Sequence, residues 1–156
     1  MFGSLIKQKV LGQKADEADW LIGAELLAEG VQGKALRSMS DPGTAYDDPV
    51  LGKDPQPSHM RDFVRTGTDN GGVHINSGIP NRAFYLAATT LGGRSWEKAG
   101  RIWFETLRDS KVRPNTGFRR FANLTVDVAG RLYGASSPEQ QAVGGAWAEV
   151  GVIETA

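Results

Sequence analysis

The chain has 156 residues, and its 18 basic side chains are balanced by 18 acidic ones, so the formal net charge is zero. This balance provides no overall positive charge for nucleic acid or for an acidic membrane surface, and we expect neither partner. The absence of cysteine excludes disulfides and thiolate metal sites, and no apolar run reaches the roughly 18 residues that a membrane-spanning helix needs.

A helix is expected at the start of the chain, where apolar residues follow a helical spacing. These residues are Phe2, Leu5, Ile6 and Val10. The helix is expected to end near Gly12, and no capping residue precedes it, so we expect it to begin upstream of Met1. The apolar segment 20–27 is too short for periodicity to separate helix from strand, and we interpret it as irregular or weakly extended.

The segment 30–77 is expected to be rich in loops, because prolines and many Gly, Asp and Ser residues interrupt it. The prolines are Pro42, Pro49, Pro55 and Pro57. Such a long stretch without regular elements is usually either functional or disordered. Apolar residues recur along it and favour an ordered, packed segment: Leu36, Met39, Tyr46, Met60, Phe63 and Val64.

A run of helices is expected in the second half. The first extends from about Ile79 to the glycine pair at 92–93. The second has Ser95 as its expected N-cap and ends before Pro114. Its expected buried residues are Ala99, Ile102, Trp103 and Leu107.

Two further helices complete the expected architecture. The third ends at Gly134 and carries apolar residues spaced by three and four. Those residues are Phe118, Phe121, Thr125, Val128 and Leu132. The fourth begins with a capping box at 137–140, in which Ser137 and Gln140 satisfy each other's backbone N–H groups; its apolar face is Val143, Trp147 and Val150. We therefore predict a mainly α fold, a helical bundle with a long loop-rich N-terminal half, in a single domain spanning residues 1–156.

Asp69 and His74, in the segment DNGGVHINSG, form the strongest candidate pair for chemistry. A carboxylate that accepts a hydrogen bond from one imidazole nitrogen fixes the tautomer of the ring, favours its protonated form and leaves the other nitrogen to face a substrate. Gly71 and Gly72 permit the tight turn that would join the two side chains, on a flexible piece of chain just ahead of a helix. The alternative is a loop histidine that only bonds nearby backbone.

Arg37 is the second candidate. Its planar guanidinium could bind a peptide carbonyl or a carboxylate, and the flanking Leu36 and Met39 suggest that it is partly buried. A structural arginine that bonds Asp41 or a loop carbonyl fits the sequence equally well.

The remaining sequence contains no complete catalytic site. His-Glu-x-x-His, phosphate-binding glycine loops and serine nucleophile elbows are all absent. The tryptophans at 20, 96, 103 and 147 are expected in the core. A group of basic residues is expected to form a solvated face: Lys111, Arg113, Arg119, Arg120 and Arg131.

Several segments resemble, in order, the C-terminal helical domain of thermolysin-like zinc metalloendopeptidases. They are ALRSMSDP at 35–42, TGTDNGGVHINSGIPNRAFYL at 66–86, RLYGASSPEQQAV at 131–143 and VGV at 150–152. The opening FGSLIKQ is similar to the helix that follows the third zinc ligand of that family, particularly in its protealysin-like branch. The resemblance covers residues 2–152.

The resemblance implies a role for each candidate residue. His74 would stabilise the tetrahedral oxyanion, Asp69 would orient the His74 ring, and Arg37 would hold the substrate carbonyl just after the scissile bond. Three apolar side chains would line the pocket for the residue after that bond: Ile22, Leu26 and Leu36. The implied activity is hydrolysis of peptide bonds before apolar residues in a peptide or protein substrate.

The zinc of such an enzyme would be bound upstream of this chain, where the family has its zinc ligands, general base and oxyanion tyrosine. We therefore expect a zinc-bearing N-terminal domain as partner, and neither bound zinc nor activity for this chain alone. Calcium is not expected, because Leu21 and Ala24 stand where calcium-rich members have acidic residues. Both a secreted and a cytoplasmic location are compatible with the protealysin-like branch.

The alternative function is a non-catalytic helical module that binds a peptide or a protein through the same surface. In either case, a domain separated from the other wall of its cleft is expected to expose an apolar face and to form homo-oligomers.

Overall fold

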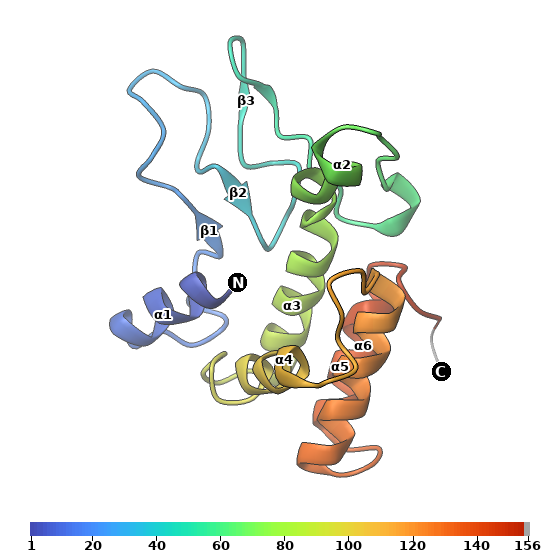
Figure 1. Ribbon diagram of the computed structural model, residues 1–156. Coiled ribbons are helices and arrows are strands. Elements are labelled where there is room, and N and C mark those ends of the chain that lie inside the picture. Colours follow the sequence, from blue (N-terminus) through green and yellow to red (C-terminus); the bar gives the residue numbers. More distant parts are fainter. Residues whose placement is uncertain (155–156) are drawn as a thin grey trace.

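A computed structural model describes residues 1–154 (Figure 1). The helices are α1 (Phe2–Leu11), α2 (Asp69–Asn76), α3 (Gly78–Leu91), α4 (Ala99–Arg108), α5 (Phe118–Tyr133) and α6 (Pro138–Glu149). The strands are β1 (Leu21–Ile22), β2 (Arg37–Ser38), β3 (Asp47–Asp48) and β4 (Gly52–Lys53), and a 3-10 helix spans Met60–Asp62. The predicted mainly α fold is confirmed.

The helices of the second half pack side by side around a core of aromatic rings. Helix α3 lies against α6, α6 against α5, and α5 against α4. The indole rings of Trp103 and Trp147 stack at 6.0 Å, and Phe84 meets Trp103 edge-on at 5.1 Å. Trp147 also donates from Nε1 to Thr125 Oγ1 at 2.7 Å, so its one polar group is satisfied in the interior. Trp20 is buried too, whereas Trp96 packs against the core and remains partly exposed.

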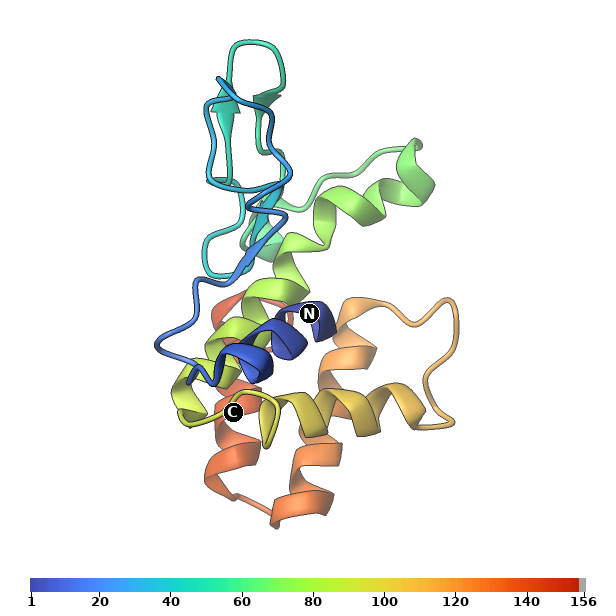
Figure 2. The ribbon, with the colours of Figure 1, turned by 90° about the vertical axis from the view of Figure 1, so that its left-hand side faces the viewer.

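The strands form two antiparallel pairs. The β3–β4 pair stands above the helices, whereas the β1–β2 pair lies level with α2 and the start of α3 (Figure 1 and Figure 2). In the β1–β2 pair Ile22 lies opposite Arg37, and in the β3–β4 pair Asp48 lies opposite Gly52. The segment 20–27, which we interpreted as irregular or weakly extended, contributes β1 and little else that is regular.

Buried carboxylates hold the loop-rich segment together, as expected for an ordered rather than a disordered stretch. Asp48 accepts hydrogen bonds from three backbone N–H groups, of residues 32, 50 and 51, and these bonds lower the pKa of its carboxyl group. Asp54 accepts from the backbone of residues 43, 45 and 56. Met39 is fully buried below these loops. Side chains therefore satisfy the loop backbone where a regular ladder is missing.

Two expectations for α4 are wrong. The helix begins at Ala99 rather than after Ser95, because residues 95–98 form a turn in which the Ser95 carbonyl accepts from the backbone of Gly100 at 2.7 Å. Leu107 is 48% exposed, because the buried stripe of α4 passes through Thr106 and leaves Leu107 on the outer side with Phe104.

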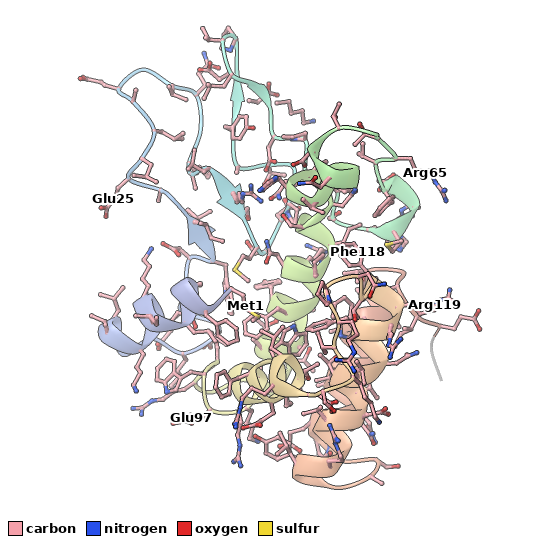
Figure 3. The ribbon with its side chains drawn as sticks, viewed as in Figure 1. Met1, Glu25, Arg65, Glu97, Phe118 and Arg119 are labelled. Atoms are coloured by element: carbon pink, nitrogen blue, oxygen red, sulfur yellow. The ribbon has the colours of Figure 1, made fainter. Side chains whose placement is uncertain are left out.

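The capping box of α6 is half present. Ser137 Oγ accepts from the backbone N–H of Gln140, as predicted. The Gln140 side chain instead accepts from the N–H of Ser136, one residue before the expected partner. Arg131 and the other predicted basic residues are exposed, and side chains such as Arg65 and Arg119 point away from the body of the molecule (Figure 3).

Helices α1 and α4 leave apolar side chains exposed along a groove of about 450 Å³. Phe2 and Phe104 meet edge-on there with ring centres 6.3 Å apart, and Ile6 lies beside them. None of the helices among residues 1–154 is long and apolar enough to cross a membrane.

Gly145, in the interior of α6, offers a stabilising substitution. Apart from the adjoining backbone of α6, no atom of residues 1–154 would lie within 4 Å of a methyl group there, so Gly145→Ala gains helix propensity without a clash. We expect about 0.5–1 kcal/mol of added stability in urea unfolding. The matched control is Gly72→Ala, which should destabilise, because Gly72 has a φ of 76° and the new methyl would lie 2.9 Å from Asn76 Nδ2. A neutral or negative effect of Gly145→Ala would contradict the prediction.

Candidate functional site

The chain makes a left-handed turn at the start of α2. Residues 69–72 have φ values of 54°, 49°, 84° and 76° in order, and right-handed helix follows. L-residues pay about 1–2 kcal/mol each in this conformation, which Asp and Asn tolerate better than most, so glycine at 71 and 72 limits the cost. We expected a flexible loop ahead of a helix. The segment is instead a short helical element whose first turn has the opposite hand.

This turn brings the carboxylate of Asp69 against His74. Asp69 Oδ2 accepts from the backbone N–H of His74 at 2.9 Å, and Oδ1 pairs with the ring Nδ1. The imidazole side chain is 74% exposed, and no hydrogen bond within residues 1–154 uses its Nε2. The expected contact is therefore present, and the alternative of a ring bonded only to backbone is wrong.

The two hydrogen bonds stabilise the ionised form of Asp69. The bond to the His74 side chain lowers the pKa of the carboxyl group below its usual value, partial burial opposes this shift, and the bond from the His74 backbone N–H adds to it. Because the pKa in the folded protein is depressed, the pair contributes its full stability above the ordinary carboxyl pKa of about 4 and loses it as the pH falls through the folded value.

His74→Ala is expected to raise the pKa of Asp69 towards its usual value, because the largest cause of the depression is then removed. The carboxyl carbon shift of Asp69, followed by NMR against pH, measures this change. Asp109 is the internal control, since its pKa is lowered by Arg131 at a separate place in the fold and should not move. An unchanged Asp69 titration would contradict the assigned cause.

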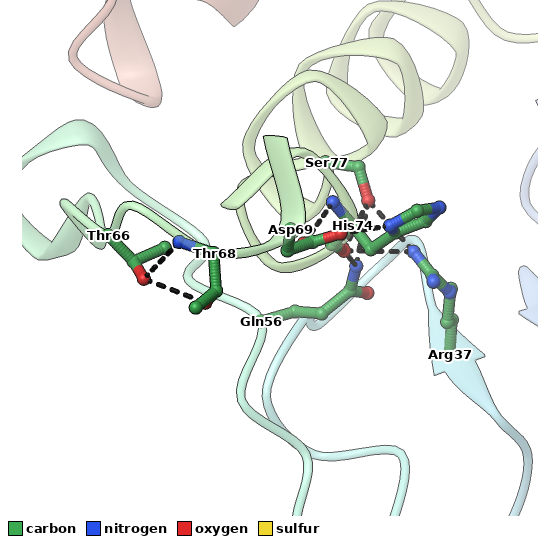
Figure 4. A network of polar contacts seen from close by, with 7 residues as sticks. All are labelled: Arg37, Gln56, Thr66, Thr68, Asp69, His74 and Ser77. Atoms are coloured by element: carbon green, nitrogen blue, oxygen red, sulfur yellow. Dashed lines mark hydrogen bonds and ion pairs between the residues drawn. The ribbon is translucent and has the colours of Figure 1, made fainter. Parts of the chain in front are cut away.

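Arg37 reaches this pair from β2. Its Nη1 donates to the His74 carbonyl at 3.1 Å and to Ser77 Oγ at 2.8 Å (Figure 4). The side chain is half-buried, as expected, and the bonded carbonyl belongs to His74 rather than to the loop around Asp41. The guanidinium group is thus fixed beside the imidazole.

The three apolar candidates lie around the same strand pair. Ile22 is the cross-strand partner of Arg37, and its carbonyl accepts from the backbone of Leu36 at 3.1 Å. The side chains of Leu26 and Leu36 both lie over Gly23, at 3.3 and 2.9 Å from the position of a Cβ there. Leu36 is 42% exposed and Leu26 more so. The structure thus groups all the candidate residues, from β1 to α2, at one end of the molecule.

Sequence reasoning missed three polar residues that support this group. Gln56 donates from Nε2 to the His74 carbonyl at 2.8 Å and to Ser77 Oγ at 2.9 Å. Asn76 bonds both the N–H and the carbonyl of Val64, which fixes the segment that leads into Asp69. Ser77 and Asn76 fall inside the HINSG motif, whereas Gln56 lies in the proline-rich loop with no local pattern to mark it.

Metal binding by these residues has no structural support. Among residues 1–154, no three or more His, Cys, Asp or Glu side chains are grouped so that they could hold a metal ion. The described residues therefore do not fit a zinc site.

Comparisons with known proteins give a consistent result. A family model described as "Thermolysin metallopeptidase, alpha-helical domain" matches residues 1–152. The chain is 59% identical over 152 residues to an extracellular metalloprotease of Pectobacterium carotovorum, covering 97% of this chain and 43% of that protein. It is 54% identical over 154 residues to protease PrtS of a Photorhabdus strain, covering 97% of this chain and 41% of that protein.

A solved structure agrees with these relatives. The protealysin precursor, a metalloproteinase from Serratia proteamaculans, superposes with a TM-score of 0.94 at 60% identity, covering 97% of this chain and 47% of that one. The chain spans less than half the length of each of these proteins.

Proposed function

The chain belongs to the thermolysin metallopeptidases, as their α-helical domain, and on that premise we propose that it is the substrate-binding and oxyanion-stabilising half of a zinc-dependent endopeptidase that cleaves before apolar residues. The observation that carries the proposal is the exposed His74 ring beside Arg37, which bonds Asp69 through one nitrogen and has no hydrogen bond at the other within residues 1–154.

His74 donates a hydrogen bond to the oxygen that becomes negative when a peptide carbonyl is attacked. Its Nδ1–H is bound by Asp69, so Nε2 is the nitrogen that faces the substrate. Both nitrogens donate only in the protonated ring, so this role requires the imidazolium form. Fixing the ring in advance means that it needs no reorganisation when the charge develops.

Arg37 and the apolar cluster bind the substrate just after the scissile bond. The guanidinium group has donors beyond Nη1, which already bonds His74 and Ser77, and these remain for a substrate carbonyl. Leu36 and Leu26 offer exposed apolar surface next to Arg37, and Ile22 is the cross-strand partner of Arg37 in the same strand pair. Such surface favours an apolar side chain at that position of the peptide.

The metal belongs to the remainder of a longer enzyme in this proposal, because the described residues do not fit a zinc site and the chain spans less than half of its relatives. Several relatives are named extracellular proteases, which supports export of the parent enzyme. The exposed groove between α1 and α4 supports association of the isolated domain.

Substrate preference tests the proposal. In the complete two-domain enzyme, Leu36→Asp is expected to lower kcat/KM about tenfold or more for peptides with leucine after the scissile bond, because the apolar wall becomes charged. Peptides with lysine at that position should lose less. Val50→Asp is the matched control, an exposed apolar residue at the β3–β4 turn. Equal losses for both peptides, or a loss caused equally by Val50→Asp, would contradict the proposed pocket.

A further inference from the structure

A hydrogen-bonded cluster beside the His74 ring contains four polar groups: the His74 carbonyl, Ser77 Oγ, Arg37 Nη1 and Gln56 Nε2. The His74 carbonyl accepts from Arg37 Nη1, from Gln56 Nε2 at 2.8 Å and from Ser77 Oγ at 2.9 Å. Ser77 Oγ in turn accepts from Arg37 at 2.8 Å and from Gln56 at 2.9 Å. The serine hydroxyl thus uses its one donor and both acceptor positions. Arg37 and Gln56 thus share the same two acceptors, the His74 carbonyl and Ser77 Oγ (Figure 4).

We propose that Gln56 is a positioning residue. Through the two shared acceptors, the His74 carbonyl and Ser77 Oγ, it sets the placement of the His74 ring and of the Arg37 guanidinium. The proposal rests on the function proposed above, because it concerns the same site. The amide nitrogen must face His74, since a backbone carbonyl only accepts. Gln56 itself is buried, with 6% of its surface exposed, so it acts through its neighbours rather than on a substrate.

Backbone hydrogen bonds around Gln56 hold its side-chain amide in place. Its N–H donates to Asp54 Oδ1 at 3.1 Å, and the other oxygen of Asp54 bonds the turn at residues 43–45. On the opposite side, Gly78 at the start of α3 lets the loop pass closely, since a Cβ there would lie 2.5 Å from the Pro57 carbonyl and 3.0 Å from Gln56 Cβ. The loop, α2 and α3 therefore meet at this side chain.

A purely stabilising role explains the presence of glutamine at position 56 less well than a positioning role does. Its Oε1 is buried, and no hydrogen-bond partner for it lies within residues 1–154. A buried acceptor left unpaired costs free energy that an apolar side chain of similar length would not. Gln8 Oε1 and Ser95 Oγ are also buried without a partner within residues 1–154. At Gln56 the cost accompanies the bonds from the amide nitrogen to the His74 carbonyl and to Ser77 Oγ, which fits a demand for placement.

Two variants of the complete two-domain enzyme test the inference. Gln56→Met keeps the length of the side chain and removes the donor, and Gln56→Glu keeps the shape and sets a carboxylate against the His74 carbonyl. Small displacements of reacting groups lower rates by up to about 10²-fold. We expect Gln56→Met to lower kcat/KM about tenfold and Gln56→Glu to lower it further. Because Arg37 binds substrate and His74 acts during the reaction, KM should rise while kcat falls.

The split between KM and kcat separates this role from a structural one. A variant that is only partly folded loses kcat at unchanged KM and has a lower melting temperature. Gln140→Met is the matched control, since that side chain also bonds backbone groups, at Val126 and Ser136, but lies on α6; it should leave KM and kcat unchanged. An unchanged KM in both Gln56 variants overturns the inference. If His74→Ala is also without effect, the proposed function itself fails, whereas a large effect of His74→Ala alone refutes only the role of Gln56.

Discussion

His74→Ala in the complete enzyme is expected to lower kcat by about 10²–10³-fold, the range found when one donor to a developing oxyanion is removed. The side chain is 74% exposed and its ring bonds Asp69 and no other described residue, so its removal leaves no cavity in the core. Bound zinc and the melting temperature should therefore change little. Turnover of a peptide substrate, zinc content by atomic absorption and thermal unfolding provide the three measurements.

The other histidine supplies the control for this prediction. His59 Nδ1 accepts from the backbone of Arg61 as the cap of the 3-10 helix, and its ring lies against Gly151. His59→Ala should lower stability and leave kcat close to the parent value. Turnover by His74→Ala within a few-fold of the parent enzyme would remove the basis of the proposed role.

Trp147→Ala is expected to destabilise the protein by about 3–5 kcal/mol, the cost of truncating a fully buried aromatic side chain. Trp147 stacks on Trp103, meets Phe121 edge-on at 6.2 Å and bonds Thr125, so three helices lose a common contact. Urea unfolding followed by far-UV circular dichroism measures the loss without relying on tryptophan fluorescence.

Trp96→Ala serves as the comparison for that experiment. Trp96 is partly exposed and its ring is covered on one side by Arg94, so about 1 kcal/mol is expected. A cost for Trp147→Ala no larger than for Trp96→Ala would show that the aromatic cluster is not the centre of the core.

The sequence predicted the helices of the second half well because their apolar residues repeat at helical spacing and glycines mark their ends. It misplaced details that depend on neighbours. Leu107 fits the apolar pattern of α4, yet the surface that α4 meets ends at Thr106. Ser95 is a typical N-cap, but its carbonyl bonds Gly100 and delays the start of the helix.

Local sequence predicted the Asp69–His74 contact, whereas the resemblance to thermolysin-like peptidases placed Arg37 and the apolar residues at the same site. Asp69 and His74 are five residues apart, and the glycines between them indicate a turn, so the contact follows from the sequence. Gln56 is 18 residues from His74, and Arg37 is 37 residues away. Their meeting at one carbonyl depends on how the loops pack on α3, and neither spacing nor residue type encodes that.

The left-handed turn at residues 69–72 also limits which amino acids can occupy these positions, because φ is positive at each of them. At Gly71 no atom of the described residues beyond its chain neighbours lies within 4 Å of where the Cβ of an L-residue would be, so chirality and not space opposes substitution there. A D-amino acid prefers positive φ for the same steric reason that an L-residue prefers negative φ. Chemical synthesis with D-alanine therefore offers a side chain at this position that the genetic code does not.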